Sequence, residues 1–353
     1  MRLAPLLCLL LVGCAPTELT VLATTDLGVV PHPDGVLARD GGASAVFGER
    51  SVWLFSEAVL EAPAADGATV RDSSLSWTDT MEVDPATGLR LTESVDATGA
   101  PAAFLPATAA EDDFAATHPG ARLALWPGPV VADPRRDRAL VFYWKVHAEP
   151  SGFTGRGLGV ALWTDPDAAP ERPVVDAVEG EPTLLFGPDA LTPGNAAVLN
   201  GQWIHAYACP DSGCRLARVH ADEVLDPAAW RWYQGLGDWS PAAEDALPLF
   251  TGAERMSVHW SETLSRWLVV YAEPGTNAIL GRTASALEGP WSEPTELFRT
   301  VVPSGPEPFV SAGLAHGELA TDGFETISYV RSTDVWESEQ RLVRVELEML
   351  APE

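Results

Sequence analysis

Near its start the chain runs Gly42-Ala-Ser-Ala-Val-Phe47, then Gly48-Glu-Arg50, then Ser51-Val-Trp-Leu-Phe55. A stretch of small residues is followed by a turn and by a stretch of apolar and aromatic residues. Neither stretch keeps the 3.6-residue apolar period of a helix, and each has the length of a strand. The segment therefore predicts a hairpin of two buried strands, the first of which carries small side chains.

The same pair of strands recurs four more times. We predict small-residue first strands and aromatic-rich second strands at 123–131 and 139–144, 194–198 and 202–207, 255–260 and 266–271, and 311–316 and 325–329. Further strands are expected at 215–219, 278–283 and 340–347, and trailing segments end at Trp239 and cover 289–292. The first strands lie about 60 to 80 residues apart, a spacing that suits four-stranded propeller blades with long loops.

The repeated pair of strands predicts an all-β protein, a five-bladed β-propeller. A β-sandwich also repeats short strands, but it has no reason to repeat an aromatic second strand after each small-residue first strand. In a propeller the first strands crowd around one axis, where small residues let the backbones approach, and aromatic strands pack between blades. Residues 18–23 could complete the last blade and close the ring, which would leave no exposed sheet edge. We expect the first strands to begin near Asp40, Val130, Asn195, Arg255 and Ser311.

The composition supports a folded β protein and excludes some functions. The 353 residues are 46% hydrophobic, enough for a sizeable core, and Lys145 is the only lysine, which argues against long helices built on Glu and Lys pairs. With 50 acidic residues against 22 basic ones, the formal net charge is −28. Such a charge argues against binding to nucleic acid or, by charge, to an anionic membrane.

The N-terminus predicts export and a lipid anchor. Arg2 precedes the apolar run Leu6 to Val12, which is too short to span a bilayer, so residues 1–13 are expected to be a signal peptide. The run ends in Leu11-Val12-Gly13-Cys14, which resembles the bacterial lipobox with Cys14 as the lipidated residue; a plain signal peptide with a coincidental cysteine is the alternative. Ala15 follows where an inner-membrane retention signal usually has Asp, which favours the outer membrane of the cell envelope. Residues 14–353 are then expected to form one propeller domain.

Two further cysteines remain in the mature chain, Cys209 and Cys214, separated by Pro-Asp-Ser-Gly. These turn-forming residues predict a hairpin tip that an oxidising compartment would close with a disulfide. We expect this disulfide to lie far from the propeller axis. A metal or redox site is the alternative, but no second cysteine pair or clustered histidine accompanies these two residues.

Several motifs resemble a bacterial family catalogued as domain of unknown function 4185. The first unit has Arg39-Asp40-Gly41-Gly42 and Val52-Trp-Leu-Phe-Ser-Glu57, which are similar to the family's Asp-Gly stretch and its Trp-x-Phe-Gly-Asp signature. Later units have similar motifs at 216–219, 226–230, 238–239, 282–284 and 288–292. The resemblance covers most of the mature chain and implies a five-bladed propeller, some members of which are endo-acting D-arabinan hydrolases.

The resemblance also implies a catalytic pair. Acidic residues at the positions of Asp40 and Glu57 would face the central cleft as acid and base. The chain departs from the family here, because Glu57 stands where Asp is usual and Ser56 stands where Gly is usual. A glutamate moves the carboxyl about one methylene outward, and glycoside cleavage depends on the separation of the two carboxyls. An Asp that only caps a turn and an exposed loop Glu are the alternatives.

Other polar residues on or beside first strands are candidates for substrate binding. They are Asn195, Arg255, His259 and His316. His316 lies in Leu314-Ala-His-Gly-Glu318, which is similar to a His-Pro-Glu-Leu stretch of the family; a buried histidine and an interblade ion pair are the alternatives for His316 and Arg255. No metal or cofactor is predicted. Glu111-Asp-Asp113 could bind Ca²⁺, but adjacent acids are more often a solvated run.

These features predict a lipid-anchored propeller of the cell envelope that acts on carbohydrate, with glycoside hydrolysis as the favoured chemistry. The alternative is a non-catalytic propeller that binds a glycan or a protein. We expect a monomer with a carbohydrate ligand, no nucleic-acid partner, and membrane contact only through the lipid on Cys14.

Overall fold

A computed structural model describes residues 18–321 and 323–351. The predicted signal peptide and Cys14 lie outside the described residues. Within those ranges no helix is long and apolar enough to cross a membrane.

The described chain forms five antiparallel sheets, the blades of a propeller. Blade 1 contains β2 (Val36–Phe47), β3 (Arg50–Leu60), β5 (Ser74–Thr78) and β6 (Thr92–Glu93), with the short β4 (Val70–Arg71) against β3. Blade 2 contains β7 (Arg122–Asp133), β8 (Arg138–Glu149) and β9 (Gly152–Trp163). Blade 3 contains β10 (Ala196–Asn200), β11 (Trp203–Ala208), β12 (Arg215–His220), β13 (Arg231–Gly235) and β14 (Asp238–Ser240).

The last two blades complete the ring. Blade 4 contains β15 (Met256–Ser261), β16 (Arg266–Ala272), β17 (Ala278–Ala284) and β18 (Thr295–Arg299). Blade 5 contains β19 (Val310–Ala315), β20 (Phe324–Asp334), β21 (Glu337–Leu350) and, outermost, the N-terminal β1 (Glu18–Val30). Because β1 pairs with β21, the N-terminal strand closes the ring, as the sequence predicted. The helices are α1 (Ala109–Thr117) and the 3₁₀ turns η1 (Ala221–Glu223), η2 (Pro227–Ala229), η3 (Ala243–Asp245) and η4 (Gly317–Leu319).

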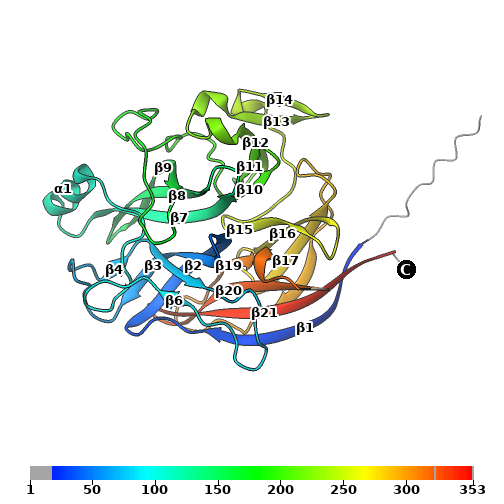
Figure 1. Ribbon diagram of the computed structural model, residues 1–353, viewed down its shortest axis with the longest axis horizontal. Helices are drawn as coiled ribbons and strands as arrows, with labels where there is room; N and C mark the ends of the chain where they lie inside the picture. Colours follow the sequence, from blue (N-terminus) through cyan, green and yellow to red (C-terminus); the bar gives the residue numbers. More distant parts are fainter. Residues whose placement is uncertain (1–17, 322, 352–353) are drawn as a thin grey trace, which may run out of the picture.

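The five first strands surround the axis. In Figure 1, β2, β7, β10, β15 and β19 lie around the centre, and the remaining strands of each blade extend outward. The prediction of a five-bladed propeller is confirmed, and each predicted first strand overlaps an observed one. The predicted start near Val130 is wrong, since β7 begins eight residues earlier at Arg122.

Large side chains fill the spaces between neighbouring blades. Leu140 and Phe142 of blade 2 pack with Ile204 and Trp230 of blade 3, for example, and equivalent apolar clusters lie between each other pair of neighbours. The aromatic second strands therefore build the core between blades, whereas the small first-strand residues leave space at the axis.

Two details differ from the sequence-based expectation. The blades are not uniformly four-stranded, since blade 2 has three strands and blades 1 and 3 have five each. Six prolines between Trp163 and Asn195 lack the N–H that a ladder needs, so this segment covers blade 2 as a loop instead of adding a strand. The fourth strand of blade 4 is β18, and residues 289–292 form the loop before it.

Candidate functional site

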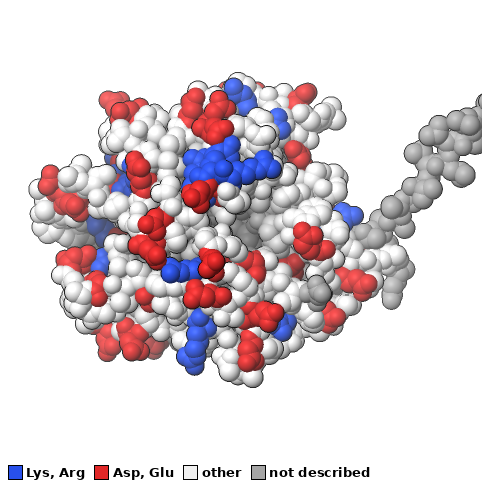
Figure 2. Space-filling model, in the orientation of Figure 1, with Lys and Arg blue, Asp and Glu red and all other residues white. Residues whose placement is uncertain are grey.

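A cavity of about 350 Å³ lies where the five first strands meet. Small residues form much of its wall, as expected for first strands that approach one another closely: Gly41, Ala43, Gly128, Ala196, Ser257 and Ala315. Figure 2 shows a hollow near the centre of one face, with carboxylates spread around it instead of gathered in a single patch. The cavity lies on the propeller axis and combines apolar walls with a few polar side chains, as ligand sites commonly do, so it is the candidate site.

Asp40 lies on β2 beside this cavity and is held by two other blades. Its Oδ1 accepts a hydrogen bond from Ser311 Oγ at 2.7 Å, and its Oδ2 lies 3.3 Å from Arg255 Nε. Arg255 also donates from Nη2 to Ser56 Oγ at 2.9 Å. Ser311 and Arg255, both distant from Asp40 in sequence, therefore fix its carboxylate beside the cavity, and Ser56 holds Arg255.

Glu57 is placed by an irregularity in the β2–β3 ladder. Asp40 pairs with Ser56 and Ala38 pairs with Val59, so β3 contains one more residue than β2 between these pairs. Glu57 is in this bulge and has φ of 50°, a left-handed conformation that is strained for a residue with a side chain. A bulge of this kind redirects the side chain from the strand's alternating pattern, which fits a functional position.

The carboxyl of Glu57 has a strongly shifted pKa. Burial raises the pKa of Glu57 to about 7, and the nearby negative charge of Asp40 acts in the same direction. Arg122 Nη2, 4.0 Å from Glu57 Oε1, lowers the pKa and only partly offsets these effects. Asp40 and Glu57 are therefore close enough to influence each other electrostatically.

Sequence reasoning missed Arg122 and Asp72. Asp72 holds Arg122 Nε through both carboxylate oxygens, at 2.8 and 3.0 Å. Arg122 opens β7, the first strand of blade 2. The rule that selected Arg255 beside a first strand would have found Arg122 as well, whereas the sequence around Asp72 contains no comparable signal.

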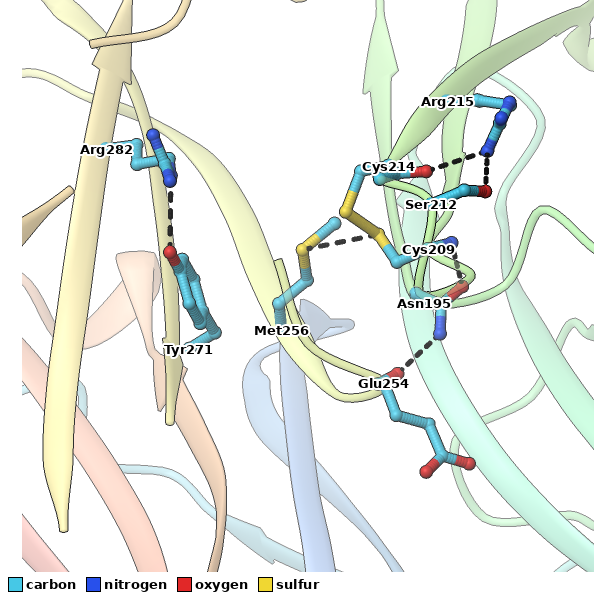
Figure 3. Close-up of a disulfide and its surroundings, with 10 residues drawn as sticks. Asn195, Cys209, Ser212, Cys214, Arg215, Glu254, Met256, Tyr271 and Arg282 are labelled. Carbon is cyan, nitrogen blue, oxygen red and sulfur yellow. Dashed lines mark hydrogen bonds between the residues drawn. A yellow bond between two sulfur atoms is a disulfide. The ribbon is translucent and has the colours of Figure 1, made fainter. Parts of the chain in front are cut away.

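Asn195 lies at the same end of the cavity but its side chain is largely engaged. Its Oδ1 accepts a hydrogen bond from the Cys209 backbone N–H at 2.8 Å, and its Nδ2 donates to the Glu254 carbonyl at 2.7 Å (Figure 3). One N–H of the amide remains for other contacts.

The predicted disulfide between Cys209 and Cys214 is present, in the turn between β11 and β12. The expectation that it lies far from the axis is wrong. Cys209 is hydrogen-bonded to Asn195 and its Sγ lies 3.9 Å from Met256 Sδ, and both partners line the cavity (Figure 3). The hairpin tip folds against the cavity wall because Asn195 caps its backbone.

His259 and His316 are separated from the acidic pair. His259 lines the cavity four residues beyond Arg255, about 13 Å further along an extended strand, and its Nε2 lies 2.9 Å from Glu325 Oε2. Burial alone would raise the pKa of Glu325, but the hydrogen bond and charge of His259 more than offset this effect and lower it.

His316 is fully buried, and this placement corrects its predicted role as a ligand contact. Its ring nitrogens are hydrogen-bonded to Ser44 Oγ at 2.6 Å and Ser328 Oγ at 2.8 Å, and the ring stacks on Trp53. Burial lowers its pKa to about 3. A side chain without exposed surface cannot contact a ligand directly, so His316 positions Ser44 in the cavity wall instead.

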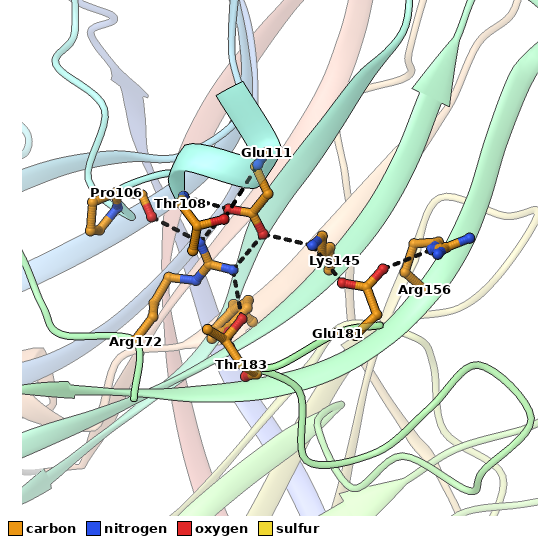
Figure 4. Close-up of polar contacts among 9 residues, drawn as sticks. Pro106, Thr108, Glu111, Lys145, Arg156, Arg172, Glu181 and Thr183 are labelled. Carbon is orange, nitrogen blue, oxygen red and sulfur yellow. Dashed lines mark hydrogen bonds and ion pairs between the residues drawn. The ribbon is translucent and has the colours of Figure 1, made fainter. Parts of the chain in front are cut away.

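The acidic run proposed for calcium also has another role. Glu111 is on α1 and faces inward, where it forms ion pairs with Arg172 and Lys145, both at 2.7 Å (Figure 4). In the part of the chain that the structure describes, no group of three or more His, Cys, Asp or Glu side chains is arranged to hold a metal ion. Glu111 is therefore a structural residue and is not available to Ca²⁺.

Comparisons with known proteins agree with the fold and with part of the family resemblance. Residues 163–321 match the family described as "Domain of unknown function (DUF4185)". The match begins at the end of β9, covers blade 3 and blade 4, and extends into blade 5, so the part of the chain with Asp40 and Glu57 precedes it. No curated protein matches the chain in sequence.

Solved structures share the propeller architecture at low sequence identity. A Bacteroides ovatus ATCC 8483 protein has a TM-score of 0.59 at 13% identity, with 88% of this chain and 87% of that chain covered. The Xanthomonas citri GH43_1 enzyme complexed with xylotriose has a TM-score of 0.51 at 13% identity, covering 92% and 90%. Zg3597 of Zobellia galactanivorans, a family 117 glycoside hydrolase, has a TM-score of 0.52 at 13% identity, covering 94% and 91%. This likeness establishes the fold.

Proposed function

We propose that this protein is a glycoside hydrolase that uses Asp40 and Glu57, which lie beside the central cavity. The observation that supports the proposal is the raised pKa of Glu57, about 7, beside a second carboxylate held by Arg255 and Ser311. Glycoside cleavage needs one carboxyl that keeps its proton near neutral pH and another that acts as a base or nucleophile. The propeller glycoside hydrolases with the same fold support carbohydrate as the substrate class.

The roles of the two residues follow from their surroundings. Glu57, which keeps its proton up to about pH 7, donates that proton to the glycosidic oxygen as the bond to the anomeric carbon breaks. Asp40 either takes a proton from the water that attacks the anomeric carbon, or attacks the anomeric carbon itself; in the second case water, deprotonated by Glu57, then attacks the anomeric carbon and releases Asp40. Arg255 and Ser311 hold the Asp40 carboxylate in position, and Arg122 limits how far the Glu57 pKa rises.

The proposal is tested with three substitutions at the pair. Asp40→Asn and Glu57→Gln should each lower the turnover of a soluble oligosaccharide by about 10³-fold, since an amide cannot ionise or donate an acidic proton. Glu57→Asp, which restores the usual family residue, should retain activity. Glu296→Gln, an exposed position on β18, is the matched control and should leave turnover unchanged.

The alternative function is non-catalytic binding of a glycan or a protein. Purified protein that binds glycans but hydrolyses neither furanoside nor pyranoside polymers, with Asp40→Asn leaving the affinity unchanged, would favour this alternative. If the purified protein bound no glycan, carbohydrate would be excluded both as the substrate of a hydrolase and as the ligand of a non-catalytic glycan-binding protein.

We also propose that Cys14 anchors the protein to the outer membrane through a lipid. The lipobox-like sequence before Cys14 supports this proposal. Two acyl chains contribute about 0.8 kcal/mol per buried CH₂, which is enough for stable anchoring. Cys14→Ser should move the protein from the membrane fraction to the soluble fraction, as measured by immunoblotting of both fractions. Unchanged fractionation would contradict the lipid anchor.

A further inference from the structure

The rim of blade 5 exposes a group of apolar side chains beside the acidic pair. Val302 and Trp336 are 71% and 75% exposed, Phe309 is 46% exposed, and Val335 is also exposed. Isolated exposed apolar residues need no explanation, but several on two adjoining segments form a candidate binding surface. We call these four residues the blade-5 rim.

Hydrogen bonds connect the two segments of the rim. The Phe309 N–H donates to Ser332 Oγ, and the Ser332 N–H donates to the Phe309 carbonyl. Arg331 donates to the Val302 carbonyl at 2.9 Å, and Ser304 Oγ donates to the Thr333 carbonyl at 2.7 Å. The loop that contains Val302 and Phe309 is therefore fixed on the β20–β21 hairpin, and the surface is preorganised for binding.

The rim is also tied directly to the strand that contains Asp40. Phe309 precedes Ser311 by two residues, and Ser311 Oγ donates to Asp40 Oδ1. Trp336 precedes Ser338 by two residues, and Ser338 Oγ accepts a hydrogen bond from the Arg39 N–H. Two residues of extended chain span about 7 Å. Both aromatic residues are thus within a short reach of the proposed reaction centre.

The charge around the rim restricts what it can bind. Glu307, Asp334 and Glu337 are exposed within or beside it, and the whole chain has a net charge of −28. An anionic polymer would be repelled. A neutral sugar ring presents a face of C–H groups that packs on an aromatic ring, and its hydroxyls can remain in water at the exposed edge.

We propose that the blade-5 rim binds a neutral polysaccharide chain that continues outward from the acidic pair, with Phe309 and Trp336 as stacking platforms. This inference rests on the proposed function for the position of the cleaved bond. It adds that the substrate is an extended polymer and that the enzyme holds several of its sugar units at once.

The binding test uses the full chain with Glu57→Gln, so that polymers remain intact during the measurement. Affinity electrophoresis in gels containing arabinan, xylan or galactan should show retardation by at least one of these neutral polymers. Phe309→Ala with Trp336→Ala should weaken that affinity about tenfold or more. Trp203→Ala, which removes an exposed tryptophan from β11 of blade 3, is the matched control and should leave it unchanged.

A second measurement separates the rim from the chemistry. In the otherwise unchanged protein, the Phe309→Ala and Trp336→Ala double variant should lose about tenfold in polymer turnover but hydrolyse a short substrate normally. Binding through the rim without any hydrolysis would support the rim and reject the proposed chemistry. The inference is overturned if the double variant binds polymer as tightly as the parent, or if the parent binds no neutral polymer. It is also overturned if the only effect of the double substitution is that a protein which co-purifies with the parent no longer does so.

Discussion

Glu57 and Glu111 are both poorly exposed glutamates that lie near arginines, yet their pKa values shift in opposite directions. Burial alone would raise the pKa of Glu111, but the hydrogen bonds and charge of Arg172, with hydrogen bonds from Lys145 and the Thr108 N–H, lower it to about 2. Glu57 has Arg122 at 4.0 Å and Asp40 nearby, so burial dominates and the pKa rises to about 7. Hydrogen-bond donors and positive charges around a buried glutamate, more than burial itself, decide whether its pKa falls or rises. A lowered pKa fixes the glutamate in the fold as an ion, whereas a raised pKa leaves it ready for proton transfer.

The partners of each glutamate explain this contrast. Arg172 donates to both oxygens of Glu111 and also to the Pro106 carbonyl and Thr183 Oγ1, so its position is fixed (Figure 4). Lys145 bridges Glu111 to Glu181, which in turn pairs with Arg156. Arg122 is instead oriented toward Asp72, which leaves Glu57 weakly compensated.

The largest expected effect comes from removing the main partner of Glu111. Arg172→Met should lower the free energy of unfolding by about 3–5 kcal/mol, because a buried carboxylate loses its bidentate donor. Urea denaturation at neutral pH measures the change. Arg299→Ala breaks an exposed pair with Glu296 and should cost less than about 0.5 kcal/mol. Equal effects of the two substitutions would contradict a structural role for the buried network.

A smaller effect is expected from the pH dependence of stability at Glu57. Its pKa in the folded protein is about 7, above the usual 4.5, so its contribution to stability is present below pH 4.5 and is lost as the pH rises through 7. Glu57→Gln removes this loss. On going from about pH 5 to about pH 8, the free energy of unfolding of the variant should therefore rise by roughly 1–2 kcal/mol relative to that of the parent, a figure that allows for the partial exposure of Glu57. Urea denaturation at both pH values measures the gain.

Two controls sharpen this comparison. For Glu296→Gln, the difference from the parent in the free energy of unfolding should be the same at both pH values. Glu111, whose pKa is lowered to about 2, contributes stability above pH 4.5 that is lost as the pH falls through 2, so the two glutamates should act in different pH ranges. If the difference in the free energy of unfolding between Glu57→Gln and the parent did not change with pH, the pKa of Glu57 would not be raised in the folded protein.

The blade architecture could be predicted from the sequence because its signals are local. Small-residue first strands, aromatic second strands and the turns between them recur at regular intervals, and each signal lies within about a dozen residues. The same is true of the hairpin tip closed by Cys209 and Cys214, whose turn residues lie between the two cysteines. Residues 289–292 were expected as the trailing segment of the fourth unit, whereas the strand that pairs with β17 is β18.

The candidate site was predictable only in part. Asp40, Glu57 and Arg255 were selected from strand positions and from the family resemblance, and the structure brings them together. Arg122 and Asp72 were missed, and the burial of His316 between Ser44 and Ser328 was not foreseen. These contacts join different blades or distant segments of one blade, so no local pattern specifies them.

The sequence by itself determined the five blades, their order and the small residues beside the axis, since these depend on local alternation and turn chemistry. Ring closure was expected from the order of the strands, but the pairing of β1 with β21 is a tertiary contact. Tertiary structure alone decided that the pKa of Glu111 is lowered to about 2 and that the pKa of Glu57 is raised to about 7. A pKa depends on burial and on charges within a few ångströms, and Arg172 lies 61 residues from Glu111 in the chain, while Arg122 belongs to a different blade from Glu57.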